Sequence, residues 1–118
     1  DGQSKPTCQL PSDAMVGRSV VTLESAQNPE LPSSPYLSAL ESAFIAEQAA
    51  QCGYCTSGLL ISATALLMNA SGTVSDLQIR AALDPHLCRC GSHNRVLKAV
   101  RKAALQCGLK IDGSEVSA

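Results

Sequence analysis

The feature that most restricts the fold of this 118-residue chain is the placement of four of its six cysteines in two close pairs. Cys52 and Cys55 form the first pair, in QCGYC, and Cys88 and Cys90 form the second, in LCRCG. Each pair interrupts a run of residues with helical periodicity, so the chain must end one helix and begin another at each pair. Thiols at such short spacing are typical of metal sites or of redox disulfides.

Apolar residues recur every three or four positions in the segments around these pairs, which predicts helices. The third helix has the clearest start, because Ser75 and Gln78 match a capping box and Val74 and Ile79 stand where a hydrophobic staple would. Asp84 and the following proline end that helix. The four predicted helices cover about residues 36–50, 57–69, 76–84 and 92–106.

The order helix, cysteine pair, helix occurs twice. Two helical hairpins with short connections pack as an antiparallel four-helix bundle, and both cysteine pairs then lie at the same end. We therefore expect a mostly α fold. The composition agrees, since apolar residues make up 45% of the chain and aromatic residues only 3%.

The segment before the helices has a different character. Residues 1–24 contain two prolines and the β-branched run GRSVVTLE, which predicts a strand or two that complete a sheet formed by strands absent from this sequence. Residues 25–35, rich in proline and serine, are predicted to be a linker. The helical domain is then expected to cover residues 36–118.

Charge and hydropathy exclude some classes of partner. The net charge of −1 leaves no basic surface for nucleic acid. The longest apolar stretch, Leu59 to Met68, is half of the roughly 20 residues that a membrane span requires. The first residues lack the pattern of a secretory signal, so the thiols are expected to form in a reducing compartment.

The spacing of the paired thiols leaves more than one metal open. Disulfides are disfavoured, because a bridge within Cys88-Arg-Cys90 would close a small, strained ring. An all-cysteine zinc site and a cluster of two iron and two sulfide ions both fit four thiolates, and the tighter C-x-C pair favours iron. Each pair precedes a helix N-terminus, which favours a negatively charged centre, as does Arg89. His86 and His93 lack the spacing of a Rieske site.

The segments QCGYCTSGLLISATALL and DPHLCRCGSHNRVLKAV resemble the iron-sulfur subunit or domain of molybdenum hydroxylases, the family of xanthine dehydrogenase and aldehyde oxidoreductase. The small-subunit type of isoquinoline oxidoreductase and membrane-bound aldehyde dehydrogenase is especially similar. The resemblance covers about residues 8–105. It implies a plant-type ferredoxin domain of β-grasp fold, whose C-terminal end would be residues 1–24, followed by a four-helix 2Fe-2S domain.

The resemblance also implies which residues are ligands. Cys52, Cys55, Cys88 and Cys90 match the ligands of the helical domain's 2Fe-2S cluster. Cys8 matches the last ligand of the ferredoxin domain's cluster, whose other three ligands, in a C-x4-C-x2-C run, do not occur in this chain. Cys107 matches no ligand and is expected to be a small buried hydrophobe.

Gln51 and Cys90 match residues that contact the pterin of the molybdenum cofactor in a large partner subunit. The family therefore implies an electron-transfer subunit of a molybdenum dehydrogenase or hydroxylase that oxidises aldehydes or N-heterocycles, without catalytic activity alone. A c-type cytochrome or a flavin subunit would accept the electrons. The expected location is the cytoplasm, or the periplasmic side of the inner membrane after folded export. A structural zinc module is the alternative.

Overall fold

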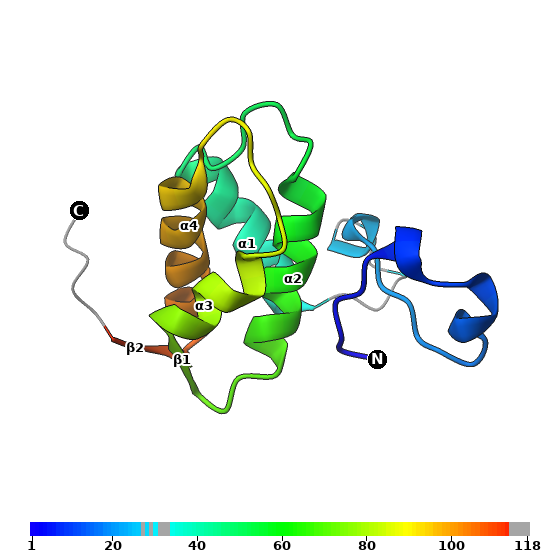
Figure 1. Ribbon diagram of the computed structural model, residues 1–118. Helices are drawn as coiled ribbons and strands as arrows, with labels where there is room; N and C mark the ends of the chain where they lie inside the picture. Colours follow the sequence, from blue (N-terminus) through cyan, green and yellow to red (C-terminus); the bar gives the residue numbers. More distant parts are fainter. Residues whose placement is uncertain (27, 29, 31–33, 114–118) are drawn as a thin grey trace.

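The computed structural model describes residues 1–26, 28, 30 and 34–113, and it is mostly helical (Figure 1). Two short strands pair in parallel at the end of the helices opposite the cysteine-bearing connections. No helix in the described ranges has both the length and the apolar character needed to cross a membrane. The elements are α1 (Pro35–Ala46), α2 (Thr56–Met68), β1 (Thr73–Ser75), α3 (Asp76–Leu83), α4 (His93–Gln106) and β2 (Lys110–Asp112).

The helices begin where local side chains satisfy their first N–H groups. Ser34 caps α1 by accepting a hydrogen bond from the backbone of Tyr36 at 3.3 Å. The capping box of α3 is confirmed, because the Gln78 N–H donates to Ser75 Oγ at 3.1 Å and the Ser75 N–H donates to Gln78 Oε1 at 2.8 Å. Helix α1 ends at Ala46, earlier than predicted, and Gln48 after it has a positive φ of 49°.

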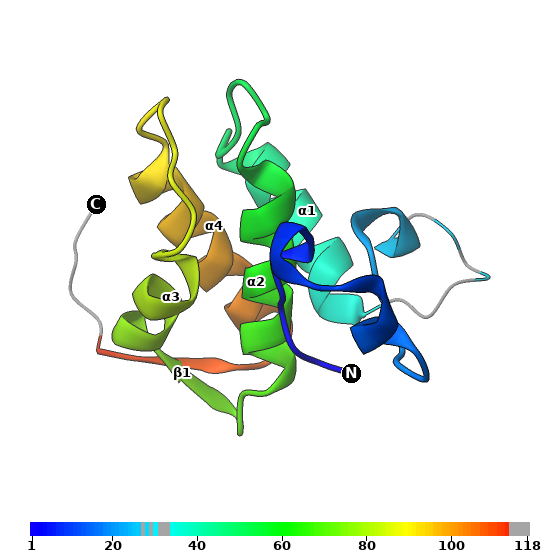
Figure 2. The same ribbon diagram turned by 45° about the vertical axis from the view of Figure 1, so that its right-hand side comes forward.

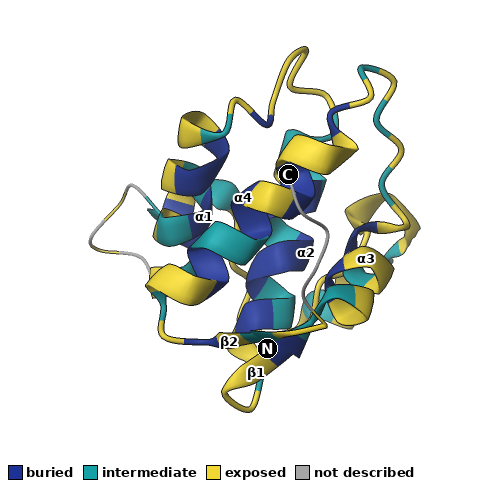
Figure 3. Ribbon diagram, turned by 90° about the vertical axis from the view of Figure 1, so that its left-hand side faces the viewer, coloured by how far each residue is buried: buried dark blue, intermediate teal, exposed yellow. Residues whose placement is uncertain are grey.

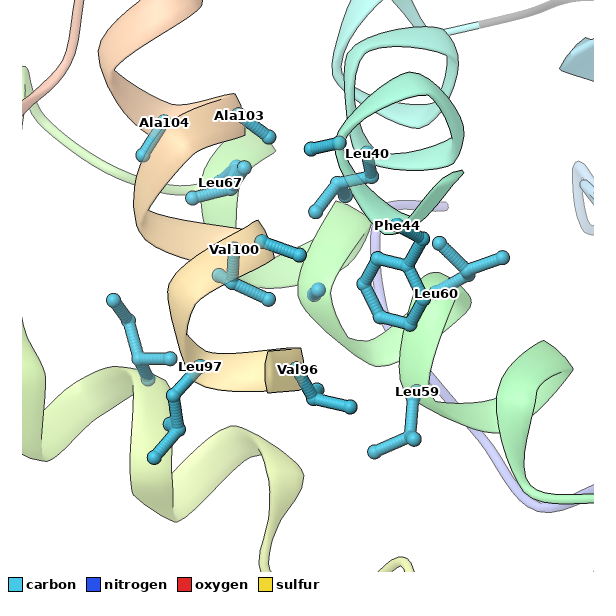
Figure 4. Packing of buried hydrophobic residues seen from close by; sticks show 14 of the residues in the cluster. Leu40, Phe44, Leu59, Leu60, Leu67, Val96, Leu97, Val100, Ala103 and Ala104 are labelled. Atoms are coloured by element: carbon cyan, nitrogen blue, oxygen red, sulfur yellow. The ribbon is translucent and has the colours of Figure 1, made fainter. Parts of the chain in front are cut away.

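The hydrophobic core lies between α1, α2 and α4 (Figure 4). Leu40 of α1, Leu67 of α2 and Val100 of α4 are all 0% exposed. Burying a leucine or valine side chain of this kind contributes about 1.5–3 kcal/mol. Helix α4 packs against α1 and contains several fully buried alanines, whose small side chains allow neighbouring backbones to approach closely: Ala99, Ala103 and Ala104.

Two acidic side chains attach α4 to its neighbours. Glu47, just after α1, pairs with Lys98 at 3.1 Å and with Lys102 at 3.0 Å. Asp76, the first residue of α3, pairs with Arg101. These contacts, together with the core, fix the position of α4, whose first turn follows the second cysteine pair.

The N-terminal segment differs from the prediction. Residues 1–26 contain three 3-10 helices (Thr7–Gln9, Ser12–Met15 and Leu23–Ala26) and no strand, so the strand predicted in GRSVVTLE is wrong. A single β-branched run has no ladder to join in this chain, and backbone hydrogen bonding is then satisfied locally. The segment lies beside α2 (Figure 2), where Ser4 Oγ and Ser62 Oγ are 2.9 Å apart.

The predicted linker, residues 25–35, is only partly described. Residues 27, 29 and 31–33 lie outside the described residues. At its two ends, Ser25 is buried in the third 3-10 helix and Ser34 caps α1. The helical part of the fold therefore begins at Pro35, one residue before the predicted start.

Candidate metal centre

The two cysteine-bearing connections lie at the same end of the helices, as predicted (Figures 1 and 2). The first joins α1 to α2, and Cys55 is the N-cap residue of α2. The second joins α3 to α4, and Ser92, two residues after Cys90, is the N-cap residue of α4. Gly53 and Gly91 have φ values of 82° and 73°, which other residues rarely adopt, and they allow each connection to turn tightly.

Within this end of the molecule the four thiols meet in cross pairs. Cys52 of the first connection and Cys90 of the second lie near enough for each side chain to affect the pKa of the other. Cys55 and Cys88 are related in the same way. All four, like Cys8, are free thiols rather than disulfides. We call Cys52 with Cys90, and Cys55 with Cys88, the two cross pairs, because each combines one cysteine from each connection.

In each cross pair, the pKa of one thiol is lowered. The backbone N–H of Tyr54, followed by the Cys90 thiol, lowers the pKa of Cys52. The backbone N–H of Ser92 is the largest influence on Cys88, and with help from Cys55 it lowers the pKa of the Cys88 thiol to about 7 against the effect of desolvation. Oriented N–H groups of the two connections therefore stabilise negative charge on sulfur.

The partner thiols have the opposite tendency. Desolvation, then the neighbouring Cys88, raises the pKa of Cys55. The backbone N–H of Cys52 favours the thiolate of Cys90, but the Cys52 side chain, desolvation and the charge at Cys88 together raise its pKa. In each pair, one thiol therefore ionises more readily than the other. A bound metal ion would favour the thiolate form of both sulfurs.

The arrangement of the thiols matches one of the metals that the spacing left open. Among the described residues, no group of three or more His, Cys, Asp or Glu side chains forms a metal site as the structure stands, and this favours neither metal. A zinc site needs four ligands around one ion, whereas a two-iron cluster needs two thiolates on each of two irons. The donor set, four thiols in two pairs, therefore fits a 2Fe-2S cluster.

The surroundings of the thiols are exposed (Figure 3). Cys52 is exposed and the other three paired cysteines are half-buried. At the tips of the two connections, the side chains of Tyr54 and Leu87 are 94% and 90% exposed, and Arg89 is exposed between the second pair of cysteines. Large apolar side chains on both sides of a candidate centre are typical of a surface that meets a partner.

Gln51 is exposed and precedes Cys52. It lines an open groove of about 620 Å³ together with Glu41, Ile45 and Arg95. The Arg95 guanidinium on α4 donates to the Gln48 carbonyl at 3.4 Å, which connects α4 to the first connection. The groove gives a partner access to the Gln51 amide beside the thiols.

Three other residues singled out in the sequence do not belong to the two thiol pairs. Cys8 is exposed in the first 3-10 helix of the N-terminal segment. Cys107 follows the C-terminal end of α4, the far end from the second pair, and burial raises the pKa of its thiol. His93 is exposed in the first turn of α4.

Sequence reasoning missed the roles of His86 and Ser92. His86 Nε2 and Ser62 Oγ are 2.7 Å apart, so the residue two positions before Cys88 is bonded to α2. Ser92 donates its backbone N–H to Cys88, as described above. Ser62, a polar residue within the mostly apolar α2, was a signal for the first contact, whereas no sequence pattern indicated the second.

Comparison with known proteins identifies one family. A family model described as [2Fe-2S] binding domain matches residues 22–101. A nicotinate dehydrogenase chain of Pseudomonas putida is 43% identical over 104 residues, covering 88% of this chain and 62% of that protein. The alpha chain of isoquinoline 1-oxidoreductase of Brevundimonas diminuta is 38% identical over 104 residues, covering 88% and 64%. The aldehyde oxidoreductase iron-sulfur-binding subunit of Escherichia coli is 31% identical over 103 residues, covering 75% and 42%.

The chain spans less than two thirds of the length of these relatives. The matched region contains α1, α2, α3, both cysteine pairs and the part of α4 up to residue 101. All four paired cysteines lie within the matched residues. This chain belongs to the [2Fe-2S] binding domain family.

Proposed function

We propose that this chain is an electron-transfer part of a molybdenum-cofactor dehydrogenase or hydroxylase that oxidises aldehydes or N-heterocycles. The observation that carries the proposal is the meeting of four thiols in two cross pairs at the exposed end of a [2Fe-2S] binding domain. Relatives named nicotinate dehydrogenase and isoquinoline 1-oxidoreductase support the N-heterocycle class. The chain itself makes and breaks no substrate bond.

In this proposal, Cys52 and Cys90 bind one iron, and Cys55 and Cys88 bind the other. When bound, the cluster accepts and releases one electron at a time. The residues of the chain hold the four sulfurs in place, and the N–H groups of Tyr54 and Ser92 stabilise their negative charge. The helix N-termini after each pair act in the same direction.

The cysteine-bearing end is proposed to dock on the large molybdenum subunit. Gln51 and Cys90 then contact the pterin, with the Gln51 amide reaching the partner through the open groove. The exposed side chains of Tyr54 and Leu87 supply apolar contact area around the electron path. Their burial would also exclude water from the half-buried thiols.

The N-terminal segment is proposed to be the end of a plant-type ferredoxin-like domain (residues 1–24), followed by a linker (25–35) and the helical domain (36–118). Cys8 would be the last ligand of a second 2Fe-2S cluster in that domain. Val16 and Val20, which are 82% and 61% exposed, are apolar side chains available for packing in such a domain. Four rather than two iron atoms per iron-sulfur subunit in the native complex would support this assignment.

The electrons that leave the cluster are proposed to pass to a flavin protein or to a c-type cytochrome, since both can accept one electron at a time. The visible spectrum of the purified native complex distinguishes them, since a haem and a flavin absorb differently. Fractionation of the source cells decides between the cytoplasm and the periplasmic side of the inner membrane.

The proposed function is tested with the native complex under anaerobic conditions. Nicotinate, isoquinoline and a simple aldehyde are mixed in turn with the oxidised complex, and the visible absorbance of the cluster is followed. At least one substrate is expected to bleach the cluster to the extent that dithionite does. Bleaching by dithionite alone, or stoichiometric zinc without labile sulfide, would contradict the proposal.

A further inference from the structure

Ser92 carries a buried hydroxyl that the proposed ligand set does not use. Its side chain is at the N-cap of α4 and the residue is only 5% exposed. An N-cap serine normally accepts a hydrogen bond from a backbone N–H of the first helical turn, but this one does not. Among the described residues, Ser92 Oγ is a buried side-chain oxygen without a hydrogen-bond partner.

The position of Ser92 brings this hydroxyl close to a cysteine sulfur. Gly91, with its positive φ of 73°, turns the chain back, and the Gly91 N–H donates to the Cys88 carbonyl at 3.3 Å. Ser92 is therefore the residue that follows this turn, and both its backbone N–H and its side chain lower the pKa of the Cys88 thiol. The Ser92 hydroxyl nevertheless has no hydrogen-bond partner among the described residues.

We propose that the Ser92 hydroxyl donates a hydrogen bond to the Cys88 sulfur when that sulfur is an iron-bound thiolate, and that this bond raises the reduction potential of the centre. The inference rests on the proposed function. A buried donor needs an acceptor, and a metal-bound thiolate of Cys88 is a charged acceptor in the turn that leads into Ser92. A hydrogen bond to a ligand sulfur stabilises the reduced, more negative cluster more than the oxidised one.

Ser92 is thus a positioning and tuning residue rather than a ligand. The backbone N–H of residue 92 stays in place whatever the side chain, so replacing the side chain separates its effect from that of the turn. Ser92→Ala and Ser92→Gly both remove the hydroxyl, and glycine is also well tolerated at an N-cap. Ser92→Thr keeps the hydroxyl. Ser71→Ala, an exposed serine beyond the other end of α2, is the matched control.

The test is a redox titration of the full chain, followed by the paramagnetic signal of the reduced cluster, with iron and labile sulfide measured on each sample. Ser92→Ala and Ser92→Gly are expected to keep their iron and to shift the midpoint potential to more negative values. Ser92→Thr and Ser71→Ala are expected to stay near the wild-type potential. If the proposed function itself is wrong, the wild-type protein will contain no iron and no labile sulfide, and this result is distinct from any effect of the Ser92 variants.

Two results would overturn the inference. One is an unchanged potential in Ser92→Ala and Ser92→Gly proteins that retain the cluster. The other is the loss of iron from both variants while Ser92→Thr retains it, because a tuning hydroxyl is not required for ligation. That second result would make Ser92 a structural requirement of the centre.

Discussion

The imidazole of His86 lies directly against the α-carbon of Gly58. A β-carbon at position 58 would lie 2.7 Å from His86 Nδ1 and 2.8 Å from Cε1. On its other edge, the ring bonds to Ser62 through Nε2 at 2.7 Å. The connection that carries Cys88 is therefore attached to α2, the helix that begins after Cys55.

Gly58→Ala is predicted to destabilise the protein by about 1–3 kcal/mol, the usual cost of overpacking. Alanine is intrinsically better than glycine inside a helix, so a destabilisation has to come from the displaced His86 ring and its lost bond to Ser62. The measurement is the urea unfolding midpoint, with iron content as a second readout. Less iron is expected, because Cys88 lies two residues from the displaced ring.

The matched background for this prediction is His86→Ala. Without the ring, Gly58→Ala is expected to stabilise the helix by about 0.5–1 kcal/mol, so the sign of the effect reverses. The same destabilisation with and without the ring would mean that a clash with His86 is not the reason why position 58 needs glycine.

Asp76→Asn is predicted to cost about 1–2 kcal/mol, because the mostly buried carboxylate accepts hydrogen bonds from Arg80 at 2.9 Å and from Arg101. Burial raises the pKa of Asp76, but the hydrogen bonds from Arg101 and Arg80 outweigh it and hold the pKa below its ordinary 3.8. A lowered folded-state pKa gives stability that is present above the unfolded pKa and lost as the pH falls through the folded one.

The free-energy difference between wild type and Asp76→Asn is therefore expected to stay constant between about pH 5 and about pH 8. Urea titrations across this range measure it. Arg80→Gln is the control. The Arg80 side chain is half-exposed, so the loss of its ion pair with Asp76 should cost at most about 0.5 kcal/mol. A difference that disappears within this pH range would contradict the pKa direction.

Gln51→Ala is predicted to leave iron and labile sulfide unchanged in the complex, because an amide is not among the proposed ligands. Reduction of the cluster by substrate should slow by roughly tenfold, the effect of losing about 1–2 kcal/mol of contact to the cofactor. Stopped-flow bleaching measures the rate. Gln106→Ala, exposed at the far end of α4, is the matched control. Equal rates for both variants would place the docking surface elsewhere.

A double substitution, Tyr54→Ser with Leu87→Ser, is predicted to weaken association with the large subunit while the isolated chain keeps its cluster. These side chains are almost fully exposed in this chain, so removing them should not affect the core. Exposed Leu77→Ser on α3, with 76% exposure, is the control. Affinity measured by titration of the subunits should fall for the double variant alone. A wild-type affinity in the double variant would remove these residues from the interface.

The parts of the fold that depend on local sequence were predicted well. The capping box of Ser75 and Gln78 marked the start of α3, and the helical periodicity around each cysteine pair placed both pairs at one end. By contrast, the parallel pairing of β1 with β2 was not anticipated, because three-residue strands far apart in sequence leave almost no periodic signal. The expected strand in GRSVVTLE failed for lack of a partner.

At the site, the sequence spacing predicted that the four cysteines meet at one end of the helices, but not which cysteine of one connection contacts which cysteine of the other. The contacts of Cys52 with Cys90 and of Cys55 with Cys88 depend on how two distant connections face each other. The contacts of His86 with Gly58 and Ser62, which attach the second connection to α2, carry no recognisable motif. Gln51 was identified only through the family resemblance, since its exposed position has no distinctive sequence signal.

Chemical analysis of iron and labile sulfide in the purified full chain tests the central claim most directly. Wild-type protein is expected to contain about two of each in the helical domain, with a paramagnetic signal only after one-electron reduction. Cys52→Ala, Cys55→Ala and Cys88→Ala should lose that signal, whereas Cys107→Ala should keep it. Wild-type protein with stoichiometric zinc and no labile sulfide, or a full signal in all three ligand variants, would contradict the account.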